Sequence, residues 1–280
     1  MPVLTLDYRH CDRKRPRFIK HSEVEGIALL ARQQLVDPTT EALSLQVLRA
    51  VSGLKVNGVA FELAVDTENT VHDEGGNPVL GICEYDPDVP DTAMVSVSPA
   101  GDGASEELVL STLAHELGHA VFDSPGWIVD ASRGPGLFDA IDDGARKVYR
   151  TTTRDGEHLA KAPAAGEGVG QPARGAPRSD DYFAELRANE FMGSLLVPRQ
   201  RLNAVVEELA PEHDVKIVRS PSIDPDLPGT ILTLVAEGDF GLFYLEMLQR
   251  AVAKRFGVTR RFVQVRMERY GLLRPGGVIG

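Results

Sequence analysis

The five residues HELGH, from His115 to His119, constrain the fold of this chain more than any other segment. They lie in a stretch that is typical of one amphipathic helix, with Ser105 as N-cap, two glutamates in the first turn and apolar residues at helical spacing. Pro125 and Gly126 are expected to stop it. Because a helix turns once in about 3.6 residues, both histidines fall on one face, one turn apart. A fold that contains this helix therefore presents His115 and His119 side by side on the same helix face.

Two imidazoles one turn apart can bind one Zn²⁺ at about 2.0 to 2.1 Å each. Glu116 is angled aside, where it can take a proton from a water molecule that the metal activates. The motif therefore predicts hydrolysis, with His115 and His119 as ligands and Glu116 as general base. The competing interpretation is that both histidines merely decorate a helix, and the capped, striped helix weighs against it.

A catalytic zinc site also needs a third protein ligand, and the residues alone leave three candidates. His158 lies in a segment rich in Gly, Ala and Pro, and His213 lies in an irregular stretch. Glu185 lies on a helix expected from 179 to 196, with Asn189 one turn later as a group that could orient a zinc histidine.

Candidates for stabilising a transition state are less distinctive. Tyr182 precedes Glu185 by one turn, and the chain also offers His158, Tyr85 and Tyr149. Each of them is equally compatible with a packing or surface role.

The run from Glu185 to Pro198, ELRANEFMGSLLVP, resembles the second signature of the ImmA/IrrE metallopeptidases, E-x-x-A/C-N-x-F-A-A followed by a Leu-rich turn and proline. In that family HExxH supplies two metal ligands and the glutamate of the second motif supplies the third. The resemblance implies a gluzincin-like zinc site in this chain, held by His115, His119 and Glu185 with Glu116 as base. The same ligand set would also accept Mn²⁺.

The likeness is close over 180–198 and loose over 20–125 and the tail. This chain departs from the family pattern at Met192 and Gly193, where a pair of alanines is usual, and in its longer segment between the two motifs.

The family resemblance also implies a function. It predicts a zinc endopeptidase whose protein substrate is a helix-turn-helix transcriptional repressor, acting in stress response, mobile-element control or toxin–antitoxin regulation. The alternative is a non-proteolytic regulator that keeps the zinc fold and binds a protein partner or DNA through its C-terminal segment.

The order of the expected elements predicts a mixed α/β (α+β) fold, a zincin-like core with a small antiparallel or mixed sheet beside the active-site helix. Ser22 and Glu25 form a capping box for a first helix that ends at about Leu35. The other expected elements are a helix over 41–51, strands over 59–66, 79–85 and 92–98, and a hairpin of 215–218 with 230–235. Of these strands, 92–98 is the candidate edge along which a substrate would lie.

Two domains are expected. Residues 1–210 form the peptidase domain, within which 151–180 has the composition of a flexible insertion. Residues 211–280 contain the hairpin and a helix-turn-helix-like segment over 245–273.

The turn in this C-terminal segment is placed at Gly257, and Thr259 is expected to cap its second helix. Arg260, Arg261 and Arg266, with Arg269, are candidates for contacting phosphates or a partner.

The overall composition argues against some classes of binding partner. A net charge of −11 argues against general nucleic-acid affinity, and no Lys or Arg occurs from 56 to 132. The chain contains neither an apolar run of about 18 residues nor a signal-like N-terminus, which predicts a cytoplasmic protein without a membrane partner. Cys11 and Cys83 are expected to be free thiols, although Cys83 is also conceivable as a metal ligand. The oligomeric state stays open.

Overall fold

A computed structural model describes residues 2–11, 14–16, 18–101, 104–132, 147–151, 180–222 and 229–273. Its fold is mixed α/β, as the sequence predicts. The insertion predicted over 151–180, including His158, lies outside the described residues except at its two ends. Among the described residues, none of the helices combines the length and the apolar character that crossing a membrane requires.

The main sheet has six described strands in the order β1-β2-β3-β7-β6-β8. It is mixed, because β1 with β2 and β3 with β7 are parallel whereas the other neighbours are antiparallel. Its strands are β1 Val3–Leu6, β2 Gly53–Val56, β3 Val59–Asp66, β6 Gly81–Tyr85, β7 Thr92–Val97 and β8 Lys147–Thr151. A separate two-stranded sheet pairs β4 Val71–His72 with β5 Pro78–Val79.

The prediction of the sheet edge was wrong. Residues 92–97 form β7, which lies between β3 and β6 and is therefore an inner strand. Among the described strands, the edge beside β6 is β8, where Tyr149 pairs with Cys83. Because β8 has only five residues, it gives too short a pattern to be predicted from the sequence.

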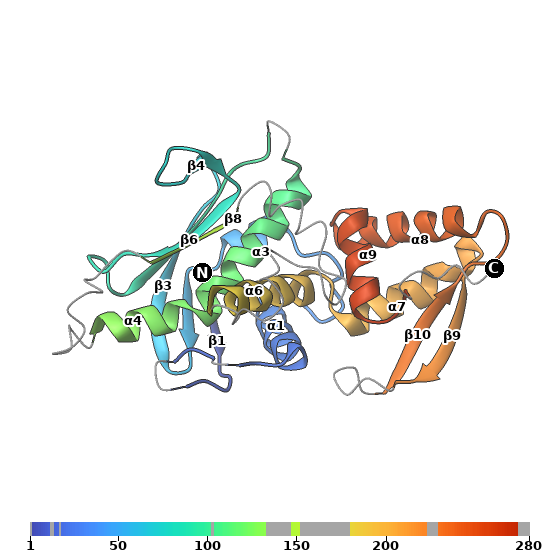
Figure 1. Ribbon diagram of the computed structural model, residues 1–280, viewed down its shortest axis with the longest axis horizontal. Coiled ribbons are helices and arrows are strands. Elements are labelled where there is room, and N and C mark those ends of the chain that lie inside the picture. The colour runs from blue at the N-terminus through green and yellow to red at the C-terminus, as the bar shows by residue number, and fades with distance from the viewer. Residues whose placement is uncertain are drawn as a thin grey trace, which may run out of the picture.

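Helices pack against this sheet and against each other (Figure 1). α3 contacts β6, β7 and β8, and α6 lies along both α3 and α1. Their bounds are α1 His21–Leu35, α2 Leu45–Arg49, α3 Glu106–Phe122, α4 Ser124–Ser132 and α6 Asp180–Leu196. The predicted cap of α3 is confirmed, since the Ser105 side chain accepts a hydrogen bond from the Leu108 N–H.

Three expected helix boundaries need correction. The N-cap of α1 is Lys20 rather than Ser22, and Glu23 rather than Glu25 accepts from its N–H at 2.9 Å. α2 is shorter than the expected 41–51. α3 ends at Phe122, but Pro125 and Gly126 belong to α4, where a proline in the first turn leaves no internal hydrogen bond unmade.

The C-terminal part follows α6 (Figure 1). It contains α7 Arg199–Leu209, a 3₁₀ turn Ala210–His213, the hairpin β9 Lys216–Pro221 with β10 Thr230–Val235, α8 Gly241–Phe256 and α9 Arg260–Arg269. The hairpin is confirmed as antiparallel. Gly257 joins α8 to α9 with a φ of 66°, and the Thr259 side chain accepts from the Phe262 N–H, both as predicted. α7 was not predicted, because Pro198 ends one helix and caps the next.

Candidate metal centre

The two motifs meet. Glu185 on α6 faces both histidines of α3, with its Oε2 3.4 Å from His115 Nε2 and its Oε1 3.3 Å from His119 Nε2. The two Nε2 atoms lie 3.1 Å apart. Both imidazoles are buried, whereas Glu185 is partly exposed. The cluster is therefore closed on the α3 side and reachable from outside at Glu185.

The close approach of α3 and α6 brings these ligands together, and it depends on small residues. A Cβ atom on Gly118 would lie 2.9 Å from the Ala188 Cα and 3.2 Å from its carbonyl oxygen. Gly118 is the fourth residue of HELGH, and Ala188 is the alanine of the second motif. Each motif thus supplies both a ligand and the small residue that lets the helices touch.

The donor set fits a divalent cation. Ligands bound tetrahedrally at about 2.0 to 2.1 Å are about 3.3 Å apart, and the three separations in the structure are 3.1, 3.3 and 3.4 Å. Two imidazole nitrogens and a carboxylate are a donor set that zinc commonly takes. These three residues are close enough to hold a metal ion. Cys83 is not part of this group.

The charges favour the same conclusion. Burial opposes a charge on His119, but hydrogen bonds to Asp123 and Glu185 outweigh it and raise its pKa to about 10. Burial would raise the pKa of Glu185, yet its contacts with His115 and His119 hold it well below the usual range. The cluster therefore attracts positive charge to its centre, as a proton or as a cation.

A second layer of contacts holds His119. Its Nδ1 lies 3.1 Å from Asp123 Oδ2, and Arg187 donates to the other carboxylate oxygen at 2.9 Å. All three side chains are buried. Because a carboxylate only accepts, Nδ1 donates to Asp123, and Nε2 is the nitrogen that faces the cluster and would bind a cation in place of a proton. The orienting role that the sequence predicts for Asn189 therefore falls to Asp123, since Asn189 makes no hydrogen bond to either histidine among the described residues.

Tyr149 on β8 packs flat against the other side of His119, with ring centroids 4.2 Å apart and planes 13° apart. Trp127 on α4 stacks on Tyr149 in turn, at 5.5 Å. The His119 ring is thus fixed by stacking as well as by its hydrogen bond.

Glu116 is fully buried and lies outside the three-residue donor group. Its Oε1 accepts a hydrogen bond of 2.5 Å from the Thr151 hydroxyl on β8, and its Oε2 has no partner among the described residues. Burial raises the pKa of this carboxyl. One oxygen is thus positioned by Thr151, while the other has no hydrogen-bond partner among the described residues.

The space for Glu116 comes from Gly81 on β6. A Cβ atom there would lie 2.7 Å from Thr112 Cγ2 and 2.9 Å from Glu116 Oε1. Neither Gly81 nor Thr151 was expected at this site, and a lone glycine or threonine in a strand gives no signal that would have found them.

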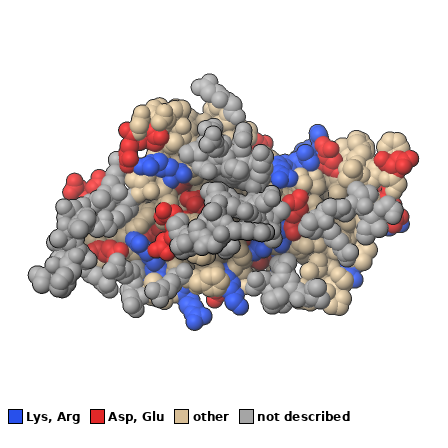
Figure 2. All heavy atoms as spheres, viewed as in Figure 1, with Lys and Arg blue, Asp and Glu red and all other residues tan. Residues whose placement is uncertain are grey.

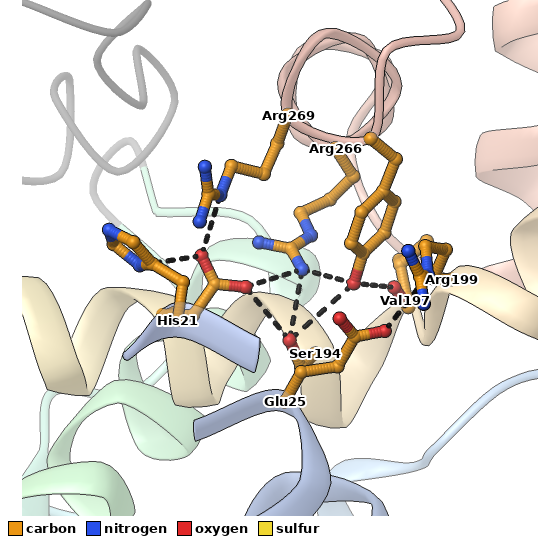
Figure 3. A network of polar contacts seen from close by, with 9 residues as sticks. His21, Glu25, Ser194, Val197, Arg199, Arg266 and Arg269 are labelled. Carbon is orange, nitrogen blue, oxygen red and sulfur yellow. Dashed lines mark hydrogen bonds and ion pairs between the residues drawn. The ribbon is translucent and has the colours of Figure 1, made fainter. Parts of the chain in front are cut away.

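α6 also carries a second buried carboxylate, on Glu190. Arg266 on α9 donates to its Oε1 at 2.9 Å, Arg269 donates to its Oε2 at 3.0 Å, and His21 lies 3.4 Å from Oε2. Figure 3 shows Arg266 and Arg269 pointing from α9 into this network, together with His21 of α1. Gly193 provides the space for the Arg266 side chain, because a Cβ atom at this position would lie 2.4 Å from an Arg266 nitrogen.

This network corrects the proposed contact role of Arg266. Its side chain is buried and is engaged by Glu190, Ser194 and Tyr270, so it faces inward rather than toward a phosphate. Arg260 contacts Gln249 and Glu246. On the described part of the face in Figure 2, acidic and basic side chains are intermixed and form no continuous basic field.

The remaining predicted residues are placed as follows. Tyr182 is half-buried and packs edge-on against Phe183. Tyr85 is buried, and Arg261 is half-buried and has an interaction of its own. His213 lies in the 3₁₀ turn after α7 and is not part of the metal-binding group. Cys11 and Cys83 are both free thiols, as expected.

Comparison with protein-family models, curated proteins and solved structures found no match to this chain. The resemblance to the ImmA/IrrE metallopeptidases therefore stays a prediction from two motifs. The cluster itself is what supports a metal centre, because a paired-histidine helix meets a carboxylate from a second helix there.

Proposed function

We propose that this protein is a zinc-dependent peptidase. The observation that carries the proposal is the cluster of His115, His119 and Glu185, with the buried Glu116 beside it and outside the donor set. Three protein ligands are the number that catalytic zinc sites use, since the remaining position is left for water or substrate. Zinc held there would act as a Lewis acid on a carbonyl group and lower the pKa of water.

Each residue around the cluster has its own task in this proposal. His115, His119 and Glu185 hold the ion, and Asp123 with Arg187 keeps the His119 lone pair directed at it. Glu116 takes the proton of the attacking water at its free Oε2 and returns it to the leaving amine. Thr151 keeps the other oxygen in place.

The sheet edge gives the substrate a place to bind. β8 is an edge strand among the described residues, and it contributes Tyr149 and Thr151 to the surroundings of the cluster. An extended peptide that pairs with β8 through main-chain hydrogen bonds would be guided past Glu116. From the motif resemblance we propose that the natural substrate is a helix-turn-helix repressor.

The first test is Glu116→Gln in the full chain. Loss of the base should lower the rate of cleavage of a candidate repressor by about 10² to 10⁴-fold, while zinc binding stays unchanged. Fragments would be quantified by mass spectrometry and zinc by elemental analysis.

The control is Glu107→Gln, an exposed glutamate on the first turn of the same helix, which should keep full activity. His119→Ala should lose both zinc and cleavage. If Glu116→Gln cleaves as fast as the unaltered protein, or if the protein takes up no zinc, the proposal is wrong. A regulatory output that survives Glu116→Gln would favour the non-proteolytic alternative.

A further inference from the structure

The outer face of α8 carries an apolar surface that the metal centre does not use. Phe240 just before the helix is 67% exposed, Phe243 is 58% exposed and Met247 is 38% exposed. These residues follow the spacing i, i+3 and i+7, so they form one stripe on one side of the helix. The core of the C-terminal part does not need them, because it is filled from the opposite side of α8 by Leu248, Val252 and Phe256.

This stripe, which we call the α8 stripe (Phe240, Phe243 and Met247), has charges of opposite sign at its two ends. Asp239 lies exposed before the helix, and Lys254 lies exposed near its C-terminal end. Read along α8, the outer face begins with Asp239, continues with the apolar stripe and ends with Arg250 and Lys254, while Glu246 at the border of the stripe pairs with Arg250 at 2.7 Å. Figure 1 shows α8 at the outer border of the C-terminal part, with the hairpin on its other side.

Such an order is complementary to itself when a second copy runs antiparallel. Pairing about Met247 sets Phe243 against the small Ala251 and Phe240 against Lys254, over about 21 Å of helix. The acidic end of each copy then meets the basic end of the other. A parallel arrangement would instead bring like charges together at both ends.

We infer that the α8 stripe is the contact surface of a homodimer in which two copies of α8 pack antiparallel about a twofold axis. The occupant is a second copy of this chain, because the charge order fits itself. One helix face per copy is a small interface, so the dimer should be weak and should depend on concentration.

The test uses sedimentation velocity on the purified full-length protein, from about 1 to about 100 µM, a range suited to a weak interface. The unaltered protein should shift from monomer to dimer with concentration. Phe243→Glu should weaken the dimer by at least about tenfold, because it sets two carboxylates into the apolar contact. Leu30→Glu is the control, since Leu30 is 49% exposed on α1 and lies outside the stripe.

Charge reversal distinguishes this geometry from any other use of the same patch. Asp239→Lys and Lys254→Glu should each weaken the dimer by about tenfold, since each change acts at both ends of a twofold contact. The double variant should recover the original strength, because the opposite charges again face each other.

A protein that is monomeric across the whole range would overturn the inference, including the case in which the patch serves a different partner. A dimer that tolerates Phe243→Glu, or a double variant weaker than either single one, would overturn it as well. Circular dichroism of every variant guards against a fold defect.

Discussion

Glu185 and Glu190 lie little more than one turn apart on α6, and their surroundings are opposite. Glu190 faces Arg266 and Arg269, so its charge is neutralised within the protein. Glu185 faces two imidazoles, and its two carboxylate oxygens lie beside the Nε2 atoms of His115 and His119, where a single positive charge would be stabilised. The same side chain on the same helix thus forms a buried ion-pair network at one position and, at the other, belongs to a group close enough to hold a metal ion.

The largest expected effect is a loss of stability when the buried carboxylate of Glu190 is removed. Glu190→Ala leaves Arg266 buried without its carboxylate, which should lower the free energy of unfolding by about 3 to 5 kcal/mol. Urea unfolding measures it. The control is Glu207→Ala, which removes an exposed ion pair with Arg219 and should cost at most about 1 kcal/mol. Equal losses in the two variants would contradict a structural role for the buried pair.

The second prediction tests the other glutamate. Zinc at about 100 to 1,000 times its dissociation constant should raise the free energy of unfolding by about 3 to 4 kcal/mol, because only the folded chain has the site. Glu185→Gln should gain far less at the same zinc concentration, as thermal unfolding with and without zinc would report. Glu190→Ala should have a lower free energy of unfolding without zinc, but zinc should raise it by as much as in the unaltered protein. A zinc effect that is the same in all three proteins would place the ion elsewhere.

A smaller effect, on zinc affinity, is expected from the Asp123 carboxylate that contacts His119 Nδ1. Asp123→Asn should weaken zinc binding by about 10- to 100-fold, since the His119 Nδ1 loses its charged partner. Competition with a chelator of known affinity measures the dissociation constant for zinc. Asn189→Ala is the matched control and should change this constant little. If Asn189→Ala weakens zinc more than Asp123→Asn does, the orienting residue has been misassigned.

The smallest effect is an acid dependence of stability. Burial would raise the pKa of Glu190, but Arg266, His21 and Arg269 outweigh it and hold the pKa below the ordinary range. A depressed pKa stabilises the fold above the unfolded value, near about 4.3, and that contribution is lost as the pH falls below it. The stability advantage of the unaltered protein over Glu190→Gln should therefore shrink by about 1 to 2 kcal/mol from pH 5 to pH 3. An advantage that does not change with pH would contradict this assignment.

The sequence predicted the parts of the site that follow a short-range rule. The helix of HELGH and its Ser105 cap are visible as local spacing, and Glu185 was one of three candidates until the second motif singled it out. Asp123 could have been found, because it stands four residues after His119, but a lone aspartate at a helix end is common. Arg187, Gly81 and Thr151 could not, because their contacts join segments that are distant along the chain.

The same limit applies to the fold. The alternation of β3 identified it as a strand, whereas the order of strands depends on long-range pairing that no local pattern records. The edge was therefore assigned to β7 instead of β8.

The hydrogen bond from Thr151 to Glu116 links the edge strand β8 with the carboxyl group that we propose as the general base. A polypeptide that lies down on β8 would stiffen the strand whose last residue steadies Glu116. Peptide binding and the orientation of Glu116 would then be coupled through a single hydroxyl group. A peptide that pairs with only part of β8 would leave Glu116 less well oriented than one that pairs along the full strand.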